Sequence, residues 1–342
     1  MVTFEKCMTE RQIRWRAKHL DIRENGHQNG REYSWILPYR YWEDSLWPGI
    51  RSGSTNSLPN YLLCNNIRKH GGVHNLKSSW MACANLYFPF RASEDGRALL
   101  SGFLQKYVPA KVQQVDEVEL EYEGNGPLHP SCLLGELDGA RGTGQTSPDI
   151  AFLVNGGRGI ILTENKLVEH SFYRCSARTR TGSSGKLGNP DPRRCENVLG
   201  VLNDPDSQCH QVVWGRKYWE RLLQVVNKEE MLALKCCPAA RAGYQLFRQQ
   251  ALAEGFAASG KYDFVVSSVA MDERNETLAN CLRSTGIADL ANGWPKLFNG
   301  KAGFAVFTHQ KWVEWVRQHD DAKKWGVSTH IRMLPKGGRS LI

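Results

Sequence analysis

Two short apolar runs joined by a tight turn most strongly constrain the fold of this chain. The first run spans residues 150–154 and reads Ile-Ala-Phe-Leu-Val, and the second spans residues 160–163 and reads Ile-Ile-Leu-Thr. Between them, residues 155–157 read Asn-Gly-Gly, and these residue types tolerate the positive φ angles that tight turns need. The pattern therefore predicts an antiparallel β-hairpin within a larger sheet.

Charged residues stand at the open end of this hairpin. Asp149 enters the first strand and Glu164 leaves the second, so antiparallel pairing brings the two carboxylates together. Lys166 shares the face of Glu164, because strand side chains alternate with period two, whereas Thr163 and Asn165 face the other way. Two carboxylates beside an ammonium suit phosphodiester hydrolysis: the carboxylates hold Mg²⁺ and a cation steadies the developing charge. The alternative is a solvated rim with a surface ion pair, which would suffice for an isolated Glu-x-Lys.

Pro148-Asp149 followed by Glu164-Asn165-Lys166 resembles the signature of the PD-(D/E)XK, or restriction-endonuclease-like, nucleases. The resemblance extends over roughly residues 78 to 252 and includes the Ser-Ser-Trp segment that begins at Ser78. It implies a metal-dependent nuclease with a mixed α/β sheet flanked by helices.

The same resemblance implies a role for each motif residue. Asp149 and Glu164 would bind Mg²⁺ or Mn²⁺, the backbone carbonyl of Asn165 would add a ligand, and Lys166 would position the nucleophilic water. Asn165 departs from the apolar residue often found at that place in the family. A third carboxylate often completes such sites, and Glu136 is the first candidate, with Glu94 as its rival.

The rest of the chain is consistent with an α/β nuclease core. We expect an N-terminal extension over residues 1–77 and a nuclease domain over residues 78–342. The nuclease domain would contain a basic, cysteine-containing insertion at residues 167–238, after the catalytic strand. Apolar spacing predicts helices at 93–107, 208–226 and 239–254, a strand at 117–122 with Glu117, Glu119 and Glu121 exposed, and late strands at 264–266 and 304–307.

The N-terminal extension is rich in aromatic and basic residues and has poor periodicity. Such residues could stack bases and neutralise phosphates, but packing onto the core is the more general explanation for any one of them. His70 and His74 flank Gly71-Gly72 and are expected to be loop histidines without a ligand role. The aromatic and basic residues concerned are Trp15, Trp35, Tyr39, Tyr41, Trp42 and Trp47 among Arg11, Arg14, Arg16, Lys18, Arg40 and Arg51.

Residues 174–194 of the insertion form a basic segment in which Asp191 is the single acid. Glycines make the segment pliable, and its position after the catalytic strand suits contact with a nucleic-acid backbone. Such contacts would set affinity and salt sensitivity, with sequence preference coming from elsewhere. The predicted phosphate-binding residues are Arg174, Arg178, Arg180, Lys186, Arg193 and Arg194.

The chain has ten cysteines, which in a cytoplasmic protein favour metal binding or simple burial over disulfides. Several follow the catalytic strand within the insertion. Cys175, Cys195, Cys209 and Cys237 are predicted to hold Zn²⁺ or an iron-sulfur cluster that fastens the insertion. His170 or His210 could replace one thiolate. Burial as small apolar side chains is the alternative, since no C-x-x-C motif occurs.

Composition narrows the function classes. The formal charge of +9 over 342 residues favours a polyanionic partner, and no apolar run approaches the roughly 20 residues needed to cross a bilayer. Together with the motif and the family resemblance, this composition leads us to expect a cytoplasmic Mg²⁺-dependent deoxyribonuclease, acting in defence against foreign DNA or in repair, as a homodimer or with a separate protein partner. The alternatives are a non-catalytic nucleic-acid-binding protein with a structural metal site, and an RNA-directed nuclease of the same fold.

Overall fold

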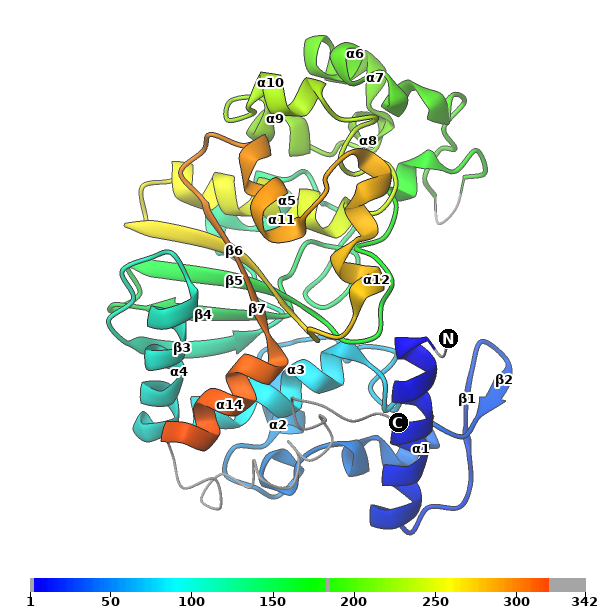
Figure 1. Ribbon diagram of the computed structural model, residues 1–342, viewed down its shortest axis with the longest axis vertical. Helices are drawn as coiled ribbons and strands as arrows, with labels where there is room; N and C mark the ends of the chain where they lie inside the picture. Colours follow the sequence, from blue (N-terminus) through cyan, green and yellow to red (C-terminus); the bar gives the residue numbers. More distant parts are fainter. Residues whose placement is uncertain (1–2, 183–184, 320–342) are drawn as a thin grey trace.

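The computed structural model describes residues 3–182 and 185–319, and a five-stranded mixed sheet lies at its centre (Figure 1). The strand order is β3-β4-β5-β6-β7. The first three strands pair antiparallel, and β5, β6 and β7 pair parallel. The predicted mixed α/β sheet is confirmed, and both late apolar runs extend it. The strands are β3 (Val115–Leu120), β4 (Ile150–Val154), β5 (Gly159–Lys166), β6 (Phe264–Met271) and β7 (Gly303–Thr308).

The central hairpin consists of β4 and β5, paired from Ile150 opposite Thr163 to Val154 opposite Gly159. Its turn has positive φ angles at Asn155, Gly156 and Gly157, as that sequence predicts. The Asn155 side chain also accepts a 2.7 Å hydrogen bond from the Gln113 N–H, which fixes the turn against the segment before β3. The predicted hairpin is therefore confirmed.

Helices cover both faces of the sheet, and side chains of β4 and β5 alternate between two hydrophobic cores. Phe152 and Ile161 face α3 (Ser79–Tyr87), α4 (Glu94–Tyr107) and α14 (His309–His319). Ile160 and Leu162 face α9 (Tyr218–Leu222) and α11 (Tyr244–Ala258) on the other side. The motif strands are thus held between two packed layers, so their ends are rigidly placed.

Two of the three predicted helices are confirmed. The helix expected at 93–107 is α4, capped by Ser93 as predicted, and that expected at 239–254 is α11, which begins later, at Tyr244, and ends later, at Ala258. The continuous helix predicted at 208–226 is wrong. The chain there breaks after α8 (His210–Val213), because Gly215 adopts a positive φ and the Lys217 N–H bonds to the Leu134 carbonyl instead of a helical partner.

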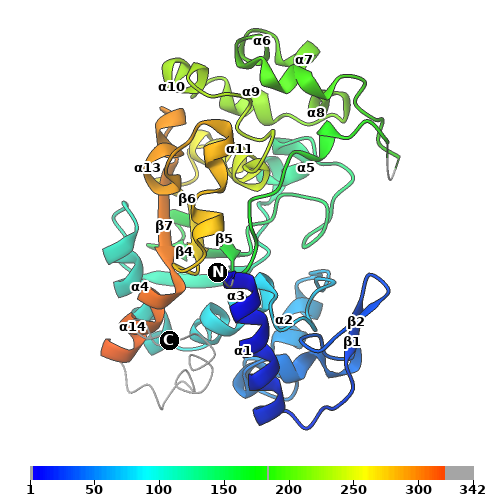
Figure 2. The same cartoon turned by 45° about the vertical axis from the view of Figure 1, so that its right-hand side comes forward.

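The N-terminal residues pack into the same core as the nuclease strands. Met8, Trp42 and Tyr61 belong to the hydrophobic cluster that contains Phe152. Figure 2 shows α1 (Phe4–His19), α2 (Leu58–Cys64) and the hairpin β1 (Gly26–Gln28) and β2 (Arg31–Tyr33) below the sheet. Packing therefore accounts for part of the aromatic content, and Arg16 is buried, donating to the carbonyls of Ile22 and Ser34.

The insertion consists of short helices joined by irregular loops, and these helices lie beyond α11, at the top of Figure 1. Residues 320–342 of the predicted nuclease domain lie outside the described residues. In the part of the chain that is described, no helix combines the length and apolar character needed to span a membrane. The remaining helices are α5 (Pro130–Leu133), α6 (Val198–Asn203), α7 (Pro205–Gln208), α10 (Lys228–Leu232), α12 (Glu276–Ala279) and α13 (Leu290–Gly293).

Candidate active site

The motif residues meet at the end of the β4–β5 hairpin. Asp149 Oδ2 accepts a 2.7 Å hydrogen bond from the Asn165 backbone N–H. Glu164 Oε1 accepts hydrogen bonds from Lys166 Nζ at 2.7 Å and from Gln245 Nε2 of α11 at 2.8 Å. The two carboxylates and the ammonium thus lie on one end of the sheet, in the arrangement that the sequence pattern predicts.

Each carboxylate keeps one oxygen available. Among the described residues, none donates a hydrogen bond to Asp149 Oδ1 or to Glu164 Oε2. The carbonyl of Asn165 points to the Asp149 side as well, because the N–H and C=O of a strand residue share a side. Two carboxylate oxygens and a backbone carbonyl are ligands that suit a hard divalent cation, so this donor set fits Mg²⁺ or Mn²⁺.

The local electrostatics also favour a bound cation. Burial raises the pKa of Asp149 well above its usual range, and the neighbouring Glu164 carboxylate raises it further. Burial alone would lower the pKa of Lys166, but the Glu164, Glu169 and Asp149 carboxylates outweigh burial and raise it, so the amine stays protonated. Because Lys166 is the ammonium paired with this cluster, a metal cation would relieve the remaining repulsion.

Glu121 adds a further acid that the sequence pattern misplaced. We expected it to be exposed on a strand, but its side chain is only 7% exposed. The chain turns after β3 through a positive φ at Glu121, which directs the residue inward, and its N–H bonds to the Asp149 carbonyl at 3.1 Å. Burial, then Asp149 and Glu164, raise the pKa of Glu121.

Glu121 does not, however, complete a three-acid metal centre. Within residues 3–182 and 185–319, no three histidine, cysteine, aspartate or glutamate side chains are arranged to hold a metal ion. The candidate cation site therefore consists of two carboxylates and one carbonyl. The remaining ligands would come from substrate phosphate and water, as is common for Mg²⁺.

His309 contacts the backbone of Lys166 and fixes its position. The His309 ring is fully buried, and its Nε2 donates a 3.0 Å hydrogen bond to the Lys166 carbonyl. Its Nδ1 then accepts from the Tyr87 hydroxyl at 3.3 Å. Burial lowers the pKa of His309, which keeps the ring neutral in this role. These contacts fix the end of β5 and hence the position of the Lys166 side chain.

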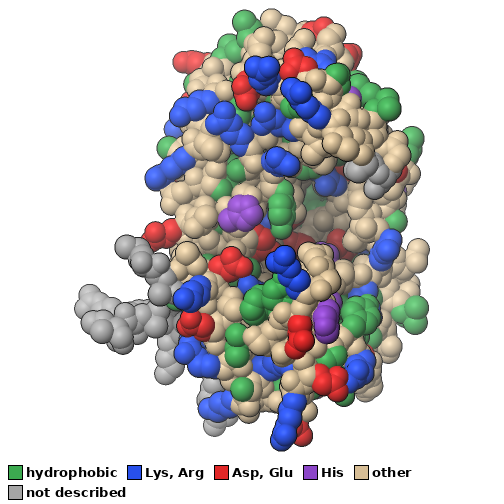
Figure 3. Space-filling model, turned by 90° about the vertical axis from the view of Figure 1, so that its right-hand side faces the viewer, with side chains coloured by type: hydrophobic (Ala, Val, Ile, Leu, Met, Phe, Trp, Pro, Cys, Tyr) green, Lys and Arg blue, Asp and Glu red, His purple; other side chains and the backbone are tan. Residues whose placement is uncertain are grey.

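The site opens into a cavity of about 450 Å³ between the nuclease core and the N-terminal residues. Figure 3 shows this side of the molecule hollowed at mid-height, with acidic side chains deep in the hollow and Lys and Arg side chains around it. Residues before Ser78 thus form one wall of the candidate active site. The lining from this part comprises Glu5, Gln28, Asn29, Tyr33, Trp35, His70, Gly72, Asn75 and Lys77.

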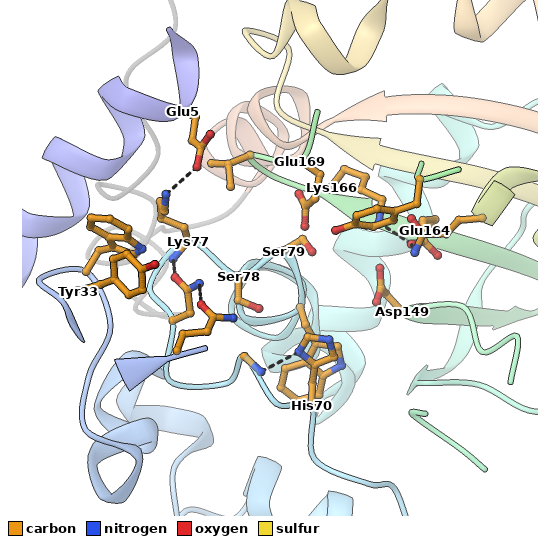
Figure 4. Close-up of a pocket in the computed structure, with 18 of the residues that line it drawn as sticks. Glu5, Tyr33, His70, Lys77, Ser78, Ser79, Asp149, Glu164, Lys166 and Glu169 are labelled. Carbon is orange, nitrogen blue, oxygen red and sulfur yellow. Dashed lines mark hydrogen bonds and ion pairs between the residues drawn. The ribbon is translucent and has the colours of Figure 1, made fainter. Parts of the chain in front are cut away.

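Many lining residues were not identified as site residues from the sequence, among them His70, Glu169 and Tyr173. His70, expected to be an ordinary loop residue, accepts a 3.1 Å hydrogen bond from the Gly72 N–H at Nδ1, and it shares the pocket with Asp149 and Lys166 (Figure 4). Glu169 and Tyr173, just past β5, line the same pocket. Their closeness in sequence to Lys166 was the available signal. No comparable signal marks His70, which long-range packing brings to the site.

Glu136 lies apart from this pocket. Its carboxylate accepts hydrogen bonds from Thr146 and from the Tyr218 hydroxyl, and it forms a 3.3 Å ion pair with Arg248. Glu136 is only 1% exposed, and these partners occupy its carboxylate, so its role is structural. The rival, Glu94, is exposed in the first turn of α4 and does not line the pocket. The structure therefore supports neither residue as a third carboxylate.

The six predicted phosphate-binding residues divide into two groups. Arg178 donates to the carbonyls of Pro192 and Ala240, and Arg194 to that of Ser207, so both hold the insertion together. Lys186 pairs with Asp138 at 2.8 Å. The remaining three have exposed side chains suited to a nucleic-acid contact. These are Arg174, Arg180 and Arg193.

The four predicted metal-binding cysteines come close enough to influence one another. Burial raises the pKa of Cys175 to about 11 and of Cys209 to about 12, and neighbouring cysteines add to both shifts. Burial, then Cys195 and Cys209, raise the pKa of Cys237. Such thiols stay protonated, and Cys175 Sγ already accepts a hydrogen bond from Gln211.

These thiols do not form a metal centre as they lie, because no described cysteine or histidine belongs to a metal-holding group. The proposed substitutes do not change this. His170 is exposed, and His210 donates to the Leu187 carbonyl. The structure thus brings the predicted cysteines into one neighbourhood, and a zinc or iron-sulfur site there stays a prediction.

Comparison with known proteins identifies one family. The family model described as "Restriction Endonuclease associating with ARP" matches residues 9–325 and so includes the N-terminal wall of the pocket. Neither the search of curated proteins nor that of solved structures found a match. The match spans most of the chain and agrees with the restriction-endonuclease-like sheet and motif described above. The chain therefore belongs to the family of restriction endonucleases associating with ARP.

Proposed function

We propose that this protein is a Mg²⁺- or Mn²⁺-dependent deoxyribonuclease that hydrolyses phosphodiester bonds. The observation that carries the proposal is the pairing of two available carboxylate oxygens, on Asp149 and Glu164, beside the protonated Lys166 in an open pocket. Membership in a restriction-endonuclease family supports the same chemistry.

The motif residues would have different roles, metal binding or positioning of water, according to where they lie. Asp149, Glu164 and the Asn165 carbonyl would hold the cation, which when bound supplies Lewis acidity and lowers the pKa of a bound water. Lys166 would orient the attacking water and stabilise charge on the phosphate oxygens. Water gives up a proton to solvent as its oxygen bonds to phosphorus, the bond from phosphorus to the leaving sugar oxygen breaks, and that oxygen takes up a proton from solvent.

DNA is the substrate that the chain favours. The formal charge of +9 suits a polyanion, and the exposed Arg174, Arg180 and Arg193 would contact phosphates of the bound DNA. The family description, with its restriction endonucleases, supports DNA over RNA. It also names an association with ARP, which supports a separate protein partner, and defence against foreign DNA is the role that fits best.

The test is cleavage of supercoiled and linear DNA, with an RNA of the same sequence alongside. Wild-type protein is compared with Asp149→Ala and Lys166→Ala, with Mg²⁺, with Mn²⁺ and with EDTA. Metal-dependent cutting of DNA that both substitutions abolish is the expected result. Cutting of RNA alone would assign an RNA-directed nuclease, and cutting unaffected by either substitution would contradict the proposed site.

A further inference from the structure

Tyr173 has a strained backbone beside the candidate active site. Its φ angle is +55°, a left-handed conformation that is costly for a bulky side chain. Strain of this kind persists only where the surroundings fix it, and it is concentrated at functional sites. The residue lies a few positions beyond Lys166, where the chain leaves the catalytic strand.

The backbone around Tyr173 is fixed by a series of hydrogen bonds to the segment before α11. The Phe172 N–H donates to the Ala242 carbonyl at 2.9 Å, and the Tyr244 N–H donates to the Tyr173 carbonyl at 3.0 Å. The neighbouring Phe172 is fully buried and anchors this segment. The left-handed turn at Tyr173 is therefore imposed by its neighbours, and it leaves the tyrosine ring outside the core.

Tyr173 is 49% exposed and lines the pocket that contains Asp149, Glu164 and Lys166. The centroid of its ring lies 5.8 Å from Lys166 Nζ. Across the cavity lie residues of the N-terminal wall, including Tyr33 and His70 (Figure 4). A large aromatic surface is thus held open next to the group that would meet the phosphate.

We infer that Tyr173 is a stacking platform for one nucleobase beside the scissile phosphate, so that the nucleotide bound there is unstacked from its neighbours. This inference rests on the proposed nuclease function. A base inside a duplex presents only its edges, because its faces are covered by adjacent bases, so a side chain stacks on a base only where the base is single-stranded or displaced. A cavity of about 450 Å³ lies in the size range of small-molecule pockets and suits one nucleotide.

The competing explanation is that Tyr173 merely covers Lys166. Replacement of one base by an abasic site, combined with substitution of Tyr173, separates the two explanations. Binding of a short single-stranded oligonucleotide is measured in EDTA, where no cleavage occurs, for wild type, Tyr173→Gly and Tyr173→Phe. The abasic site is moved along the oligonucleotide one position at a time. Tyr39→Ala is the matched control, because Tyr39 is 52% exposed and does not line the pocket.

For stacking, we expect Tyr173→Gly to weaken binding on the order of tenfold, with Tyr173→Phe and Tyr39→Ala close to wild type. At one position, the abasic oligonucleotide should bind wild type about tenfold more weakly than the intact oligonucleotide does. Tyr173→Gly should bind these two oligonucleotides equally well. The melting temperature of Tyr173→Gly should be no lower than that of wild type, because glycine adopts a positive φ without strain. The inference would be overturned if, at every position, the losses of affinity from Tyr173→Gly and from the abasic site simply multiplied. It would also be overturned if wild type did not bind the oligonucleotide.

The outcomes also separate this inference from the proposed function. Coupling between Tyr173 and one base in a protein that does not cleave with Mg²⁺ would retain the stacking site and reject the nuclease. Metal-dependent cleavage without such coupling would retain the nuclease and reject the stacking platform.

Discussion

The Asn165 backbone N–H donates a 2.7 Å hydrogen bond to Asp149 Oδ2, which ties the residue before β4 to the end of β5. This contact lies just past the last paired residues, Ile150 and Thr163, so a side chain continues the hairpin where the ladder stops. It orients the Asp149 carboxylate, and Oδ1 receives no hydrogen bond from the described residues. The geometry of the candidate cation site therefore depends on the register of this hairpin.

Asp149→Asn should abolish stabilisation by metal. In wild type, Mg²⁺ at about 100 times its dissociation constant should add about 2.7 kcal/mol to the free energy of unfolding. The amide lacks the charge that binds the cation, so this gain should disappear in the variant. Thermal melts with increasing Mg²⁺ measure the effect. Asp116→Asn is the control, because Asp116 binds the hairpin turn through Gly156 and Gly157; an unchanged Mg²⁺ response in Asp149→Asn would remove Asp149 from the metal site.

Lys166→Met should reduce the cleavage rate at saturating DNA by about 10²- to 10³-fold, the loss typical of removing one charge-stabilising group. DNA affinity should change little, because Lys166 is 3% exposed and contributes little to the surface that meets the DNA. Single-turnover cleavage and equilibrium binding measure the two effects separately. Lys261→Met, at an exposed site outside the pocket, serves as the control. An equal loss in both variants would indicate a nonspecific charge effect.

Arg178 and Arg180 should differ although they are two residues apart. Arg178→Ala removes hydrogen bonds to two backbone carbonyls and should lower the free energy of unfolding by about 1–3 kcal/mol. Urea-induced unfolding measures this change. Arg180→Ala should leave stability unchanged, weaken binding of all DNA sequences alike, and reduce the salt dependence of binding by about one ion. Loss of stability in Arg180→Ala, or an unchanged salt slope, would contradict this division.

Stability should fall in mild acid because of His309. Burial lowers its pKa below the unfolded value of about 6.5, and Asp272 opposes this only in part. A group whose folded pKa is lowered contributes stability that is full above the unfolded pKa and is lost as pH falls through the folded pKa. Urea unfolding between pH 8 and pH 5 should show this loss in wild type and a smaller loss in His309→Gln. An identical pH dependence in both proteins would exclude His309 as the cause.

The hairpin and its three charged residues could be predicted from the sequence because their determinants are local. Alternation, an Asn-Gly-Gly turn and charged ends lie within residues 149–166. Helix α4, with its Ser93 cap, was predictable for the same reason. The break between α8 and α9 was not, since it depends on a hydrogen bond from Lys217 to Leu134, which is remote in sequence.

The rest of the pocket depends on long-range packing. His70 reaches the site because the N-terminal residues share a core with β4, and Glu121 turns inward at a positive φ that its residue type does not predict. Glu136 is close to the motif in sequence. Its carboxylate, however, pairs with Arg248 and accepts a hydrogen bond from Tyr218, which belong to helices far along the chain. Proximity in sequence to the motif therefore pointed correctly to Glu169 and Tyr173 but wrongly to Glu136.

The most direct test of the central claim is the rate of Mg²⁺-dependent DNA cleavage by Asp149→Asn, relative to wild type and to Asp116→Asn, with each protein shown to be folded. We predict cleavage by wild type and Asp116→Asn, and a loss of about 100-fold or more in Asp149→Asn, because the metal supplies several kcal/mol of transition-state stabilisation. Wild-type rates in Asp149→Asn would show that the end of the β4–β5 hairpin is not the active site.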